Sequence, residues 1–448
     1  MTSLAQQTAS GGPDPLVTGS DGRILEGLAL RVTGVGQGVG PDSRIALKLH
    51  DPLDVVRALA ALDGQAEAIL LLSHALAPET AQVLAQVAGC TLFVSDMMPM
   101  AEGGIAVKPL EAVLGTHRNE DSLPTEWLMT TSGTTGVPKI VPHTLRSLAR
   151  SVYRFGGGDG QAAAPVWGLL YDPTRFAGLQ VVLQALIGGG RLVAVDTTLP
   201  LADQVAALAD HGCTHLSATP TLWRRLLMVP GHGRLPLRQV TLGGEIADQP
   251  TLNAVRAAFP TARLSHIYAS TEAGVGFSVT DGLAGFPLTY FDKAPGNVRL
   301  KIEEGVLWLR PPVTALVPGL PGIEIDNAGF VRSGDRVLVE GERVSFLGRE
   351  NGLINIGGVK VYPETVEAVV KTVPGVALVQ VFAKRSPVTG ALVVAEVQLD
   401  TGADPDSTRR LIQETCRAQL EREAVPAIIR YVAGFTTNAA GKLVRTGG

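Results

Sequence analysis

Cysteine is scarce in this chain. The 448 residues include three cysteines, which stand far apart at Cys90, Cys213 and Cys416. An odd number of widely separated cysteines excludes a disulfide framework and offers no spacing typical of zinc ligands. Free thiols of this kind are typical of a reducing compartment, so a cytoplasmic protein is expected.

Clusters of metal-ligating residue types are equally few. His211, Cys213 and His215 alternate along the chain, which would place the three on one face of a strand, as a metal site would require. The residues that follow, 216–219, are typical of an ordinary buried strand end. They favour a structural role for the three side chains over metal binding.

Neither charge nor hydrophobicity is concentrated in long runs. The formal net charge is −4 and the pI is about 6.1, so the chain lacks the basic character that nucleic-acid binding requires. No apolar run is long enough to span a membrane, and the N-terminus has no basic segment followed by an apolar core. We therefore expect no nucleic-acid partner and no membrane span.

The sequence does contain a regular alternation of strand and helix patterns after a lead-in, residues 1–21, whose Ser, Thr, Gly and Pro content predicts disorder. Alternation of this kind predicts a parallel sheet covered by helices. Strands are predicted at 44–49, 66–72, 91–94, 191–195, 215–218, 239–242 and 264–268, and helices at 52–62, 78–87, 179–186, 201–211, 221–228 and 252–259.

Past residue 280 the pattern changes to short strands punctuated by glycine and proline. A compact tail with both helix and strand patterns follows residue 349. We expect an α/β protein with a large N-terminal domain at 22–349, made of parallel α/β sheets and a β-rich subdomain. A small α+β C-terminal domain is expected at 350–448.

One short segment, 130–139, combines hydroxyls, glycines and a lysine after a predicted strand and before a predicted helix start at Pro142. Backbone N–H groups freed by glycine, hydroxyl donors and a lysine charge can together hold a phosphate. The P-loop of the NTPases is excluded, because only two residues separate Gly133 from Gly136 and Lys139 is followed by Ile140. A Ser/Thr/Gly-rich surface linker is the alternative for this segment taken alone.

The rest of the chain decides between these interpretations, because it carries an ordered set of further motifs. Together they resemble the adenylate-forming superfamily of acyl-CoA synthetases, peptide-synthetase adenylation domains and luciferases. The resemblance extends over about residues 43–445, and its motifs in this order are specific as a set although each alone is weak. The matching segments are 131–139, 243–245, 268–272, 333–335, 348–349, 357–367 and 441–442.

The resemblance implies a reaction in which a carboxylate attacks the α-phosphorus of ATP, pyrophosphate leaves, and a thiol captures the acyl-adenylate. Glu272 would bind Mg²⁺, and Thr271 beside it would contact the phosphates. The residues implied to hold the β- and γ-phosphates are Thr131, Ser132, Gly133, Thr134, Thr135, Gly136 and Lys139. Those implied to bind the adenosine part are Gly243, Gly244, Glu245, Tyr268, Ala269, Ser270, Asp335 and Arg349.

The resemblance also assigns two tasks to the small domain, which is expected to be mobile. Lys442 would bridge the attacking carboxylate and the phosphate during adenylation. The domain would then rotate, remove Lys442 and bring Gly357 and Gly358 to the thiol channel. The hinge would be Asn351, where the family commonly has aspartate or lysine.

The acid that would be activated is less well indicated. Ala269 replaces a glycine of the family pattern and adds a methyl group at the expected pocket wall, and Arg175 stands where acyl-CoA synthetases usually have histidine. Arg175 would either pair with a second acidic group on the substrate or be held by Asp172. Asp172 is also the nearest candidate for the aspartate that holds the amine in amino-acid-activating domains.

Three functions remain open at this point. The first is a ligase that joins a carboxylic acid to coenzyme A, with ATP and Mg²⁺ as cofactors. The second delivers the acyl group to the phosphopantetheine of an acyl carrier protein, and the third is a nucleotide-binding protein without catalytic activity. The intact Lys442 and Glu272 argue against the third, and the resemblance leaves a homodimer open.

Overall fold

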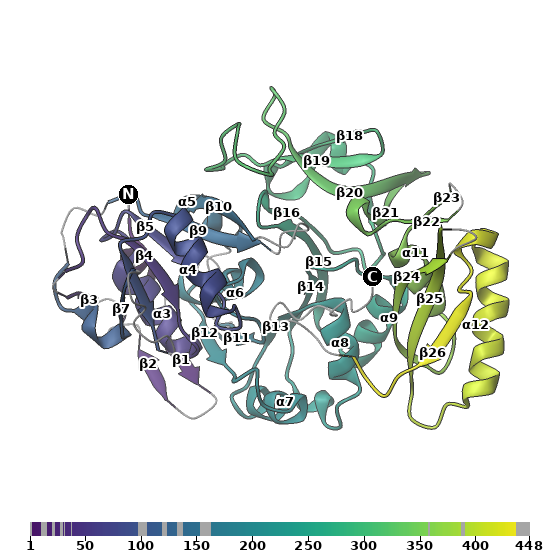
Figure 1. The fold of residues 1–448 in the computed structure, drawn as a ribbon. Helices are drawn as coiled ribbons and strands as arrows, with labels where there is room; N and C mark the ends of the chain where they lie inside the picture. The colour runs from purple at the N-terminus through teal and green to yellow at the C-terminus, as the bar shows by residue number, and fades with distance from the viewer. Residues whose placement is uncertain are drawn as a thin grey trace.

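The computed structural model describes the chain from residue 2 to residue 435 with gaps. The described ranges are 2–9, 16–19, 23–26, 30, 32–36, 38–96, 105–118, 123–131, 138–152, 163–356, 359–386 and 390–435. These residues form two large α/β sheets, a third antiparallel sheet above them and a small C-terminal domain beside them (Figure 1). No helix in the described ranges is both long enough and apolar enough to cross a bilayer.

The first large sheet is mostly parallel and has six strands. Its order is β10 (Lys139–Thr144), β9 (Glu126–Thr131), β5 (Ala68–Leu71), β4 (Arg44–Lys48), β6 (Leu92–Ser95) and β7 (Ala106–Lys108). The β10 strand pairs antiparallel with β9, whereas the other neighbours are parallel.

The second large sheet has eight strands and is also mostly parallel. Its order is β16 (Gly274–Val279), β15 (Arg263–Ser270), β14 (Gln239–Gly243), β13 (His215–Ala218), β11 (Val166–Leu169), β12 (Arg191–Ala194), β1 (Leu16–Gly19) and β2 (Ile24–Glu26). The antiparallel strands β16 and β2 stand at its two edges.

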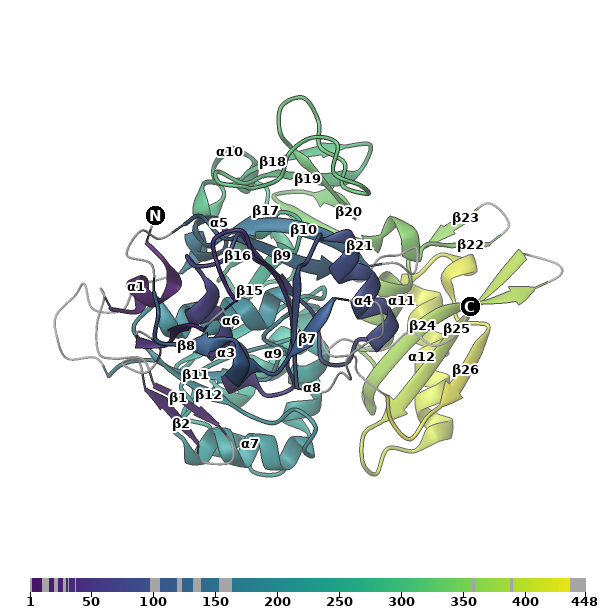
Figure 2. The same cartoon turned by 60° about the vertical axis from the view of Figure 1, so that its left-hand side comes forward.

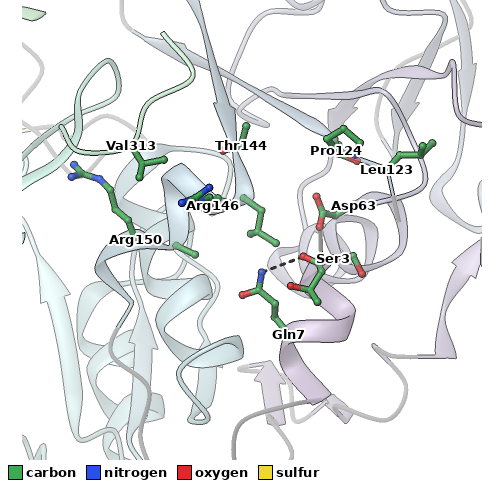
Figure 3. Close-up of a pocket in the computed structure, with 13 residues that line it drawn as sticks. Ser3, Gln7, Asp63, Leu123, Pro124, Thr144, Arg146, Arg150 and Val313 are labelled. Carbon is green, nitrogen blue, oxygen red and sulfur yellow. Dashed lines mark hydrogen bonds between the residues drawn. The ribbon is translucent and has the colours of Figure 1, made fainter. Parts of the chain in front are cut away.

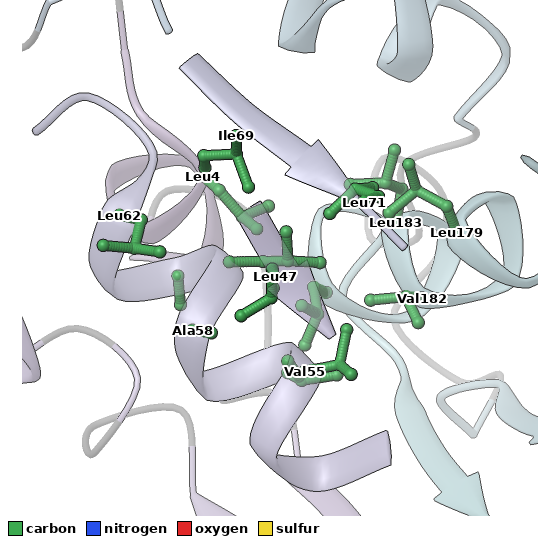
Figure 4. Packing of buried hydrophobic residues seen from close by; sticks show 14 of the residues in the cluster. Leu4, Leu47, Val55, Ala58, Leu62, Ile69, Leu71, Leu179, Val182 and Leu183 are labelled. Atoms are coloured by element: carbon green, nitrogen blue, oxygen red, sulfur yellow. The ribbon is translucent and has the colours of Figure 1, made fainter. Parts of the chain in front are cut away.

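Two helices, α3 (Pro52–Leu62) and α6 (Phe176–Leu186), pack between the two large sheets. One core cluster joins residues of both helices to strands of both sheets (Figure 4). Along β4 the side chains alternate, with Leu47 facing α3 and α6 and Ala46 facing α4 (Pro78–Val87) on the other side of the sheet. Asp51 starts α3 by accepting a hydrogen bond from the Leu53 N–H, and proline occupies the first helical position.

The outer face of the eight-stranded sheet is covered by three further helices. These are α7 (Leu201–Asp210), α8 (Pro220–Leu227) and α9 (Gln249–Ala258), which share a core cluster with β13 and β14. The helices and strands predicted from the alternating pattern are therefore present, and they form the expected α/β architecture.

An antiparallel five-stranded sheet follows in the chain and forms the upper part of Figure 1. Its order is β17 (Phe286–Pro287), β21 (Arg343–Arg349), β20 (Val331–Glu340), β19 (Val306–Arg310) and β18 (Arg299–Glu303). This sheet is the predicted β-rich subdomain. Register between β20 and β21 places Asp335 opposite Arg349.

The small C-terminal domain begins with a two-stranded sheet and continues as a three-stranded sheet covered by helices. Its elements are β22 (Ile354–Ile356), β23 (Val359–Val361), α11 (Pro363–Val370), β24 (Val376–Ser386), β25 (Gly390–Leu399), α12 (Pro405–Gln419) and β26 (Ile428–Tyr431). The views in Figures 1 and 2 place this domain beside α8, with α12 on its outer side.

A buried charge cluster connects the small domain to the large one. Asp248, at the start of α9, accepts hydrogen bonds from the Arg224 guanidinium (3.2 Å) on α8 and from the Lys371 ammonium (3.2 Å) at the end of α11. Arg224 also donates to the carbonyl of Ala377 in the small domain (3.3 Å). The Asp248 carboxylate is therefore shared between the two domains.

Each cysteine lies in a different hydrophobic core. Cys90 packs under the six-stranded sheet beside α4, Cys213 packs under α7 and α8, and Cys416 packs inside the small domain. Burial raises the pKa of all three thiols, to about 11, 12 and 11 in that order. No group of three or more His, Cys, Asp or Glu side chains able to hold a metal occurs in the described ranges.

The lead-in differs from the predicted disorder. Helix α1 (Leu4–Ala9) buries Leu4 completely in the core shared by the two large sheets. The backbone N–H of Leu4 donates to the Asp63 carboxylate (2.7 Å). Strand β1 pairs with β12. Both contacts are with residues far along the chain, which the local composition does not reveal.

The segment after the hydroxyl-rich loop also differs from the prediction. It is strand β10 and not a helix start, and the helix α5 (Leu145–Leu148) begins only after Thr144. Pro142 lies within this strand, which is tolerated because β10 is the edge strand of its sheet. The loop therefore joins the two strands of a β-hairpin.

Candidate active site

The predicted metal-binding glutamate lies at the tip of a tight turn. Strand β15 ends at Ser270 and β16 begins at Gly274, so Thr271 and Glu272 occupy the connection between them. The Ser270 hydroxyl accepts a hydrogen bond from the Ala273 N–H (3.0 Å) and closes the turn. Among the described residues, no side chain pairs with the half-buried Glu272 carboxylate, which leaves its oxygens available to a ligand.

Beside this turn, three of the predicted nucleotide-binding residues contact one another. The Tyr268 hydroxyl donates to one oxygen of the Asp335 carboxylate, and the Arg349 guanidinium donates to the other (3.0 Å). The charge of the Asp335 carboxylate raises the pKa of Arg349. The hydrogen bond between Tyr268 and Asp335 joins the end of β15, which leads into the glutamate turn, to the β20–β21 pair.

The Tyr268 ring is fixed by stacking. The rings of Phe346 and Phe277 lie nearly parallel to it, with ring centres at 5.0 Å and 5.3 Å. Burial, and then the charge of Asp335, raises the pKa of Tyr268. The phenol therefore stays protonated and acts as a hydrogen-bond donor, while each oxygen of Asp335 retains capacity to accept a further bond.

The phosphate-loop hairpin is described only at its two ends. Thr131 ends β9, opposite Lys139 at the start of β10. The Lys139 ammonium donates to the carbonyl of Gly322 (2.6 Å), in the loop between β19 and β20. The rest of the predicted loop, Ser132, Gly133, Thr134, Thr135 and Gly136, lies outside the described residues.

The predicted adenine-lining segment follows β14. Gly244 has a φ of +80°, a conformation that glycine adopts readily. The Glu245 carboxylate accepts a hydrogen bond from the Thr221 N–H (3.0 Å) in the first turn of α8, where a negative charge is favoured. Glu245 thus stabilises a helix start, and its contact with adenine, like that of Gly243, stays a prediction.

The structure excludes one of the two partners expected for Arg175. Its guanidinium donates to the carbonyl of Thr130 (3.2 Å) and lies 3.4 Å from the Thr130 hydroxyl, at the base of the phosphate-loop hairpin. The Asp172 carboxylate accepts instead from Ser73 (2.5 Å) and from Thr174 (2.9 and 2.6 Å). The expectation that Asp172 holds Arg175 is therefore wrong, because buried hydroxyl and amide donors already occupy that carboxylate.

The remaining predicted residues are placed unevenly. Ala269 lies in β15 at an irregularity in the pairing with β16, next to the glutamate turn. Asn351 is exposed in the short turn 350–352 that follows β21 and precedes the small domain. Gly357, Gly358 and Lys442 lie outside the described residues, so their implied roles stay predictions.

Two residues that the sequence did not single out reach the glutamate turn from the β10–α5 segment. The buried His143 ring is hydrogen-bonded through Nε2 to the Thr271 carbonyl (2.7 Å), and Arg150 donates to the carbonyls of Ala273 (3.1 Å) and Val275. A carbonyl only accepts, so Nε2 of His143 carries the proton. The only sequence signal was a histidine directly after Pro142, which is uninformative without the three-dimensional contact.

The burial of His143 predicts a pH-dependent stability. Burial, with an added effect of the Arg150 charge, lowers the pKa of His143 from 6.5 to about 4. The unfolded chain binds this proton at higher pH than the folded chain. The contribution of His143 to the free energy of unfolding is therefore fully present above pH 6.5 and is lost as the pH falls toward 4. Between pH 7 and pH 5 this group should cost about 2 kcal/mol of unfolding free energy.

Urea unfolding of the wild type and of His143→Gln at both pH values tests this. The variant should lose about 2 kcal/mol less than the wild type on acidification, although other buried histidines contribute equally to both proteins. An identical loss in the two proteins would contradict the assignment.

A cavity of about 440 Å³ lies at the far end of β10 from the phosphate loop. It is open on one side, between the first residues of the chain and α5 (Figure 3). Asp63 and Ser3 lie on one side of the cavity and Arg146 and Arg150 on the other. The Arg150 guanidinium reaches beyond it to the glutamate turn, so this cavity adjoins the candidate active site without including the predicted nucleotide-binding residues.

Comparison with known proteins places these features in a family. The model of the AMP-binding enzymes matches residues 35–305, and that of the AMP-binding enzyme C-terminal domain matches residues 365–442. The 2-succinylbenzoate–CoA ligase of Bacillus velezensis is 27% identical over 339 residues, which are 72% of this chain and 68% of that protein.

A probable non-canonical nonribosomal peptide synthetase, CymA of Salinispora arenicola, is 26% identical over 460 residues, which cover 92% of this chain but only 6% of that protein. The fold is shared with the o-succinylbenzoate CoA synthetase of Bacillus subtilis in complex with its acyl-adenylate intermediate. That likeness has a TM-score of 0.74 and 20% identity and covers 99% of this chain and 97% of the other. Because the first family model matches more than half of its length, this chain belongs to the AMP-binding, adenylate-forming enzymes.

Proposed function

We propose that this protein activates a carboxylic acid with ATP and transfers the acyl group to the thiol of coenzyme A. One acid oxygen attacks the α-phosphorus of ATP, the bond from that phosphorus to the bridging oxygen breaks, and pyrophosphate leaves. The thiol sulfur then attacks the acyl carbon, and AMP leaves with the electron pair of the acyl–phosphate bond. The names of the 2-succinylbenzoate–CoA ligases and their similarity to 72% of this chain support this assignment.

The observation that carries the proposal is the arrangement around Glu272. Its carboxylate is half-buried, lies in the electrostatic reach of Arg349, and has no partner among the described residues. The opposing Asp335, held by Tyr268 and Arg349, offers acceptor oxygens of the kind that ribose hydroxyls require. Glu272 can thus bind a cation and Asp335 can bind a ribose, which together suit a nucleotide with a bound metal ion.

The donor set also fits Mg²⁺, since a hard divalent cation takes carboxylate and phosphate oxygens. Glu272 would hold the ion, which when bound would neutralise phosphate charge. The chain's own contribution is positioning and electrostatic stabilisation, to which Lys139 adds a cation at the hairpin. Its hydrogen bond to the Gly322 carbonyl (2.6 Å) fixes the direction of that ammonium.

A carrier protein is the second acceptor that an observation favours. The CymA peptide synthetase matches 92% of this chain, more than the CoA ligases do, and peptide synthetases carry their acyl groups on protein-bound thiols. Both acceptors present the same phosphopantetheine thiol. The chemistry that precedes transfer is therefore common to both.

Pyrophosphate release tests the proposal when it is measured over aliphatic, aryl, dicarboxylic and amino acids, with and without coenzyme A. Release with one acid class and formation of a CoA ester would support it, whereas no release with any acid would reject it. Release without a CoA ester would favour the carrier protein. Glu272→Gln should lose the activity, while Glu342→Gln, at an exposed carboxylate between β20 and β21, serves as a matched control.

We further propose that Arg175 recognises a second acidic group on the substrate. Its guanidinium bonds only neutral oxygens of Thr130, and within the described residues no carboxylate pairs with it. A guanidinium has five N–H donors, so several remain for a ligand. Its position beside the phosphate-loop hairpin and α6 places this charge near the candidate active site.

Arg175→Leu should lower kcat/KM for dicarboxylic acids about 10- to 100-fold and leave monocarboxylic acids nearly unchanged, because a charge-assisted hydrogen bond is worth about 1.5–3 kcal/mol. For Arg175→Lys we expect a kcat/KM for dicarboxylic acids between those of the wild type and Arg175→Leu, because lysine keeps the charge but lacks the planar guanidinium. Steady-state kinetics with matched mono- and dicarboxylic acids measure this. Equal losses for both classes would mean that Arg175 only supports Thr130.

A further inference from the structure

The glutamate turn is held from outside by two side chains of one neighbouring segment. The carbonyl of Thr271, directly before Glu272, bonds the imidazole of His143 on β10 at 2.7 Å. His143 is 4% exposed, and its other ring nitrogen faces the Ser147 hydroxyl at 3.4 Å. The ring is therefore fixed on both sides, and it can hold the Thr271 carbonyl in one direction.

Arg150 provides the second attachment, just after the glutamate. It follows α5 in the chain, lines the cavity in Figure 3, and donates through one terminal nitrogen to the carbonyls of Ala273 and Val275. Gly274 between them has a φ of +71°, and a Cβ there would stand 3.4 Å from this nitrogen. The left-handed backbone and the missing side chain let the guanidinium approach the turn closely.

These contacts join the two halves of the candidate active site. His143 belongs to β10, the strand that leaves the phosphate loop, and it lies four residues past Lys139. The turn belongs to the other large sheet, so His143 and Arg150 cross from the six-stranded to the eight-stranded sheet. A displacement of one sheet would otherwise change the separation between Lys139, at the start of β10, and Glu272.

We propose that His143 and Arg150 are positioning residues that fix the Glu272 turn to strand β10 and the segment after it, so that the metal-binding carboxylate keeps one place relative to Lys139 at the start of that strand. The function of Glu272 in this statement rests on the proposed function. Neither residue touches a reacting atom or transfers a proton. His143 acts as a neutral donor at Nε2, and Arg150 acts as a donor to two carbonyls of the turn.

Hydrogen–deuterium exchange of the full chain without ligands measures the attachment directly. In His143→Leu the amides of residues 271–275 should exchange about tenfold faster, because a lost hydrogen bond of about 1.4 kcal/mol makes local opening tenfold more frequent. His143→Gln should restore slow exchange, since its amide nitrogen can replace the Nε2 donor. Arg150→Met, which has no N–H donor for the two carbonyls, provides a second variant if His143→Leu does not fold.

His266 supplies a matched control. Its buried ring makes the same kind of bond, from Nε2 to the Leu283 carbonyl at 3.0 Å, but away from the glutamate turn. His266→Leu should therefore lose comparable stability and leave exchange at 271–275 unchanged. Equal exchange in His143→Leu and the wild type, or equal effects of the leucine and glutamine variants, would overturn the proposal.

The Mg²⁺ dependence of pyrophosphate release gives the functional measurement. The Mg²⁺ concentration for half-maximal release should rise about tenfold in His143→Leu and remain near wild type in His143→Gln and His266→Leu. A purely structural loss would reduce the active fraction at every Mg²⁺ concentration without moving this midpoint, and that result would overturn the positioning role. If the wild type releases no pyrophosphate, the proposed function fails, while exchange still decides whether the two side chains hold the turn.

Discussion

Lys442→Ala is expected to slow adenylation by at least about 10²- to 10³-fold and to leave thioester formation from supplied acyl-adenylate nearly unchanged. The ammonium would stabilise charge that develops on the carboxylate and phosphate only while the new bond forms. It contributes nothing once the adenylate exists, because the small domain would then have carried it away. The role comes from the resemblance of the segment 441–442, which lies outside the described residues.

The two half-reactions are measured separately, by ATP–pyrophosphate exchange and by CoA-ester formation from synthetic acyl-adenylate. Lys384→Ala removes an exposed lysine of β24 in the same small domain and is the matched control. It should change neither rate. Equal loss of both half-reactions in Lys442→Ala would show that the lysine is structural or acts in both steps.

Asp248→Ala is expected to destabilise the protein by about 3–5 kcal/mol, the usual cost of leaving buried charges unpaired. The carboxylate is 7% exposed and neutralises both Arg224 and Lys371. It also accepts from the Thr251 N–H (2.8 Å) and hydroxyl (2.7 Å), which caps α9. The substitution thus removes a helix cap and the link between the domains at once.

The pH dependence of this effect has the same sign as that of His143, because folding lowers the pKa of both groups, but it lies at lower pH. Burial alone would raise the pKa of Asp248, but Lys371 and then Arg224 outweigh it and lower the pKa below 3.8. The stabilisation by Asp248 is therefore fully present at neutral pH and is lost only as the pH falls below the pKa that Asp248 has in the unfolded chain. The penalty of Asp248→Ala in urea unfolding should be constant between pH 8 and pH 5.

Lys371→Met separates the domain link from the helix cap. It should cost less stability than Asp248→Ala and make the connection at 350–352 more sensitive to limited proteolysis, because the small domain loses its attachment to α9. A cost below about 1 kcal/mol for Asp248→Ala would show that the buried ion pairs are not stabilising in this context.

Local patterns were sufficient to predict the central α/β elements. The helix at 52–62 follows from its cap, proline start and apolar spacing, all of which are contained in the segment itself. Strand β10 was not predicted, because a proline at position 142 is typical of a helix start. Only the sheet order shows that Pro142 lies in an edge strand. Pairing partners far along the chain carry that information.

The candidate site shows the same division. The family resemblance indicated Glu272, Asp335 and Arg349. In the structure Asp335 contacts Arg349 and also Tyr268, which lies four residues before Glu272. The sequence did not indicate that Arg175 contacts Thr130. Whether its guanidinium bonds Asp172 depends on which other donors already bond that carboxylate. The sequence did not indicate His143 either, because its partner is a backbone carbonyl, and every residue type has one.

The reactivity of the three buried cysteines can report the local opening of the cores that contain them. A thiol reacts as the thiolate, and with pKa values raised to about 11 to 12 by burial almost none is present near pH 8 until the surrounding core opens. Because Cys90, Cys213 and Cys416 belong to separate cores, pulse labelling read by mass spectrometry would time the opening of each core. The small domain could thus be followed apart from the two sheets in one unmodified molecule.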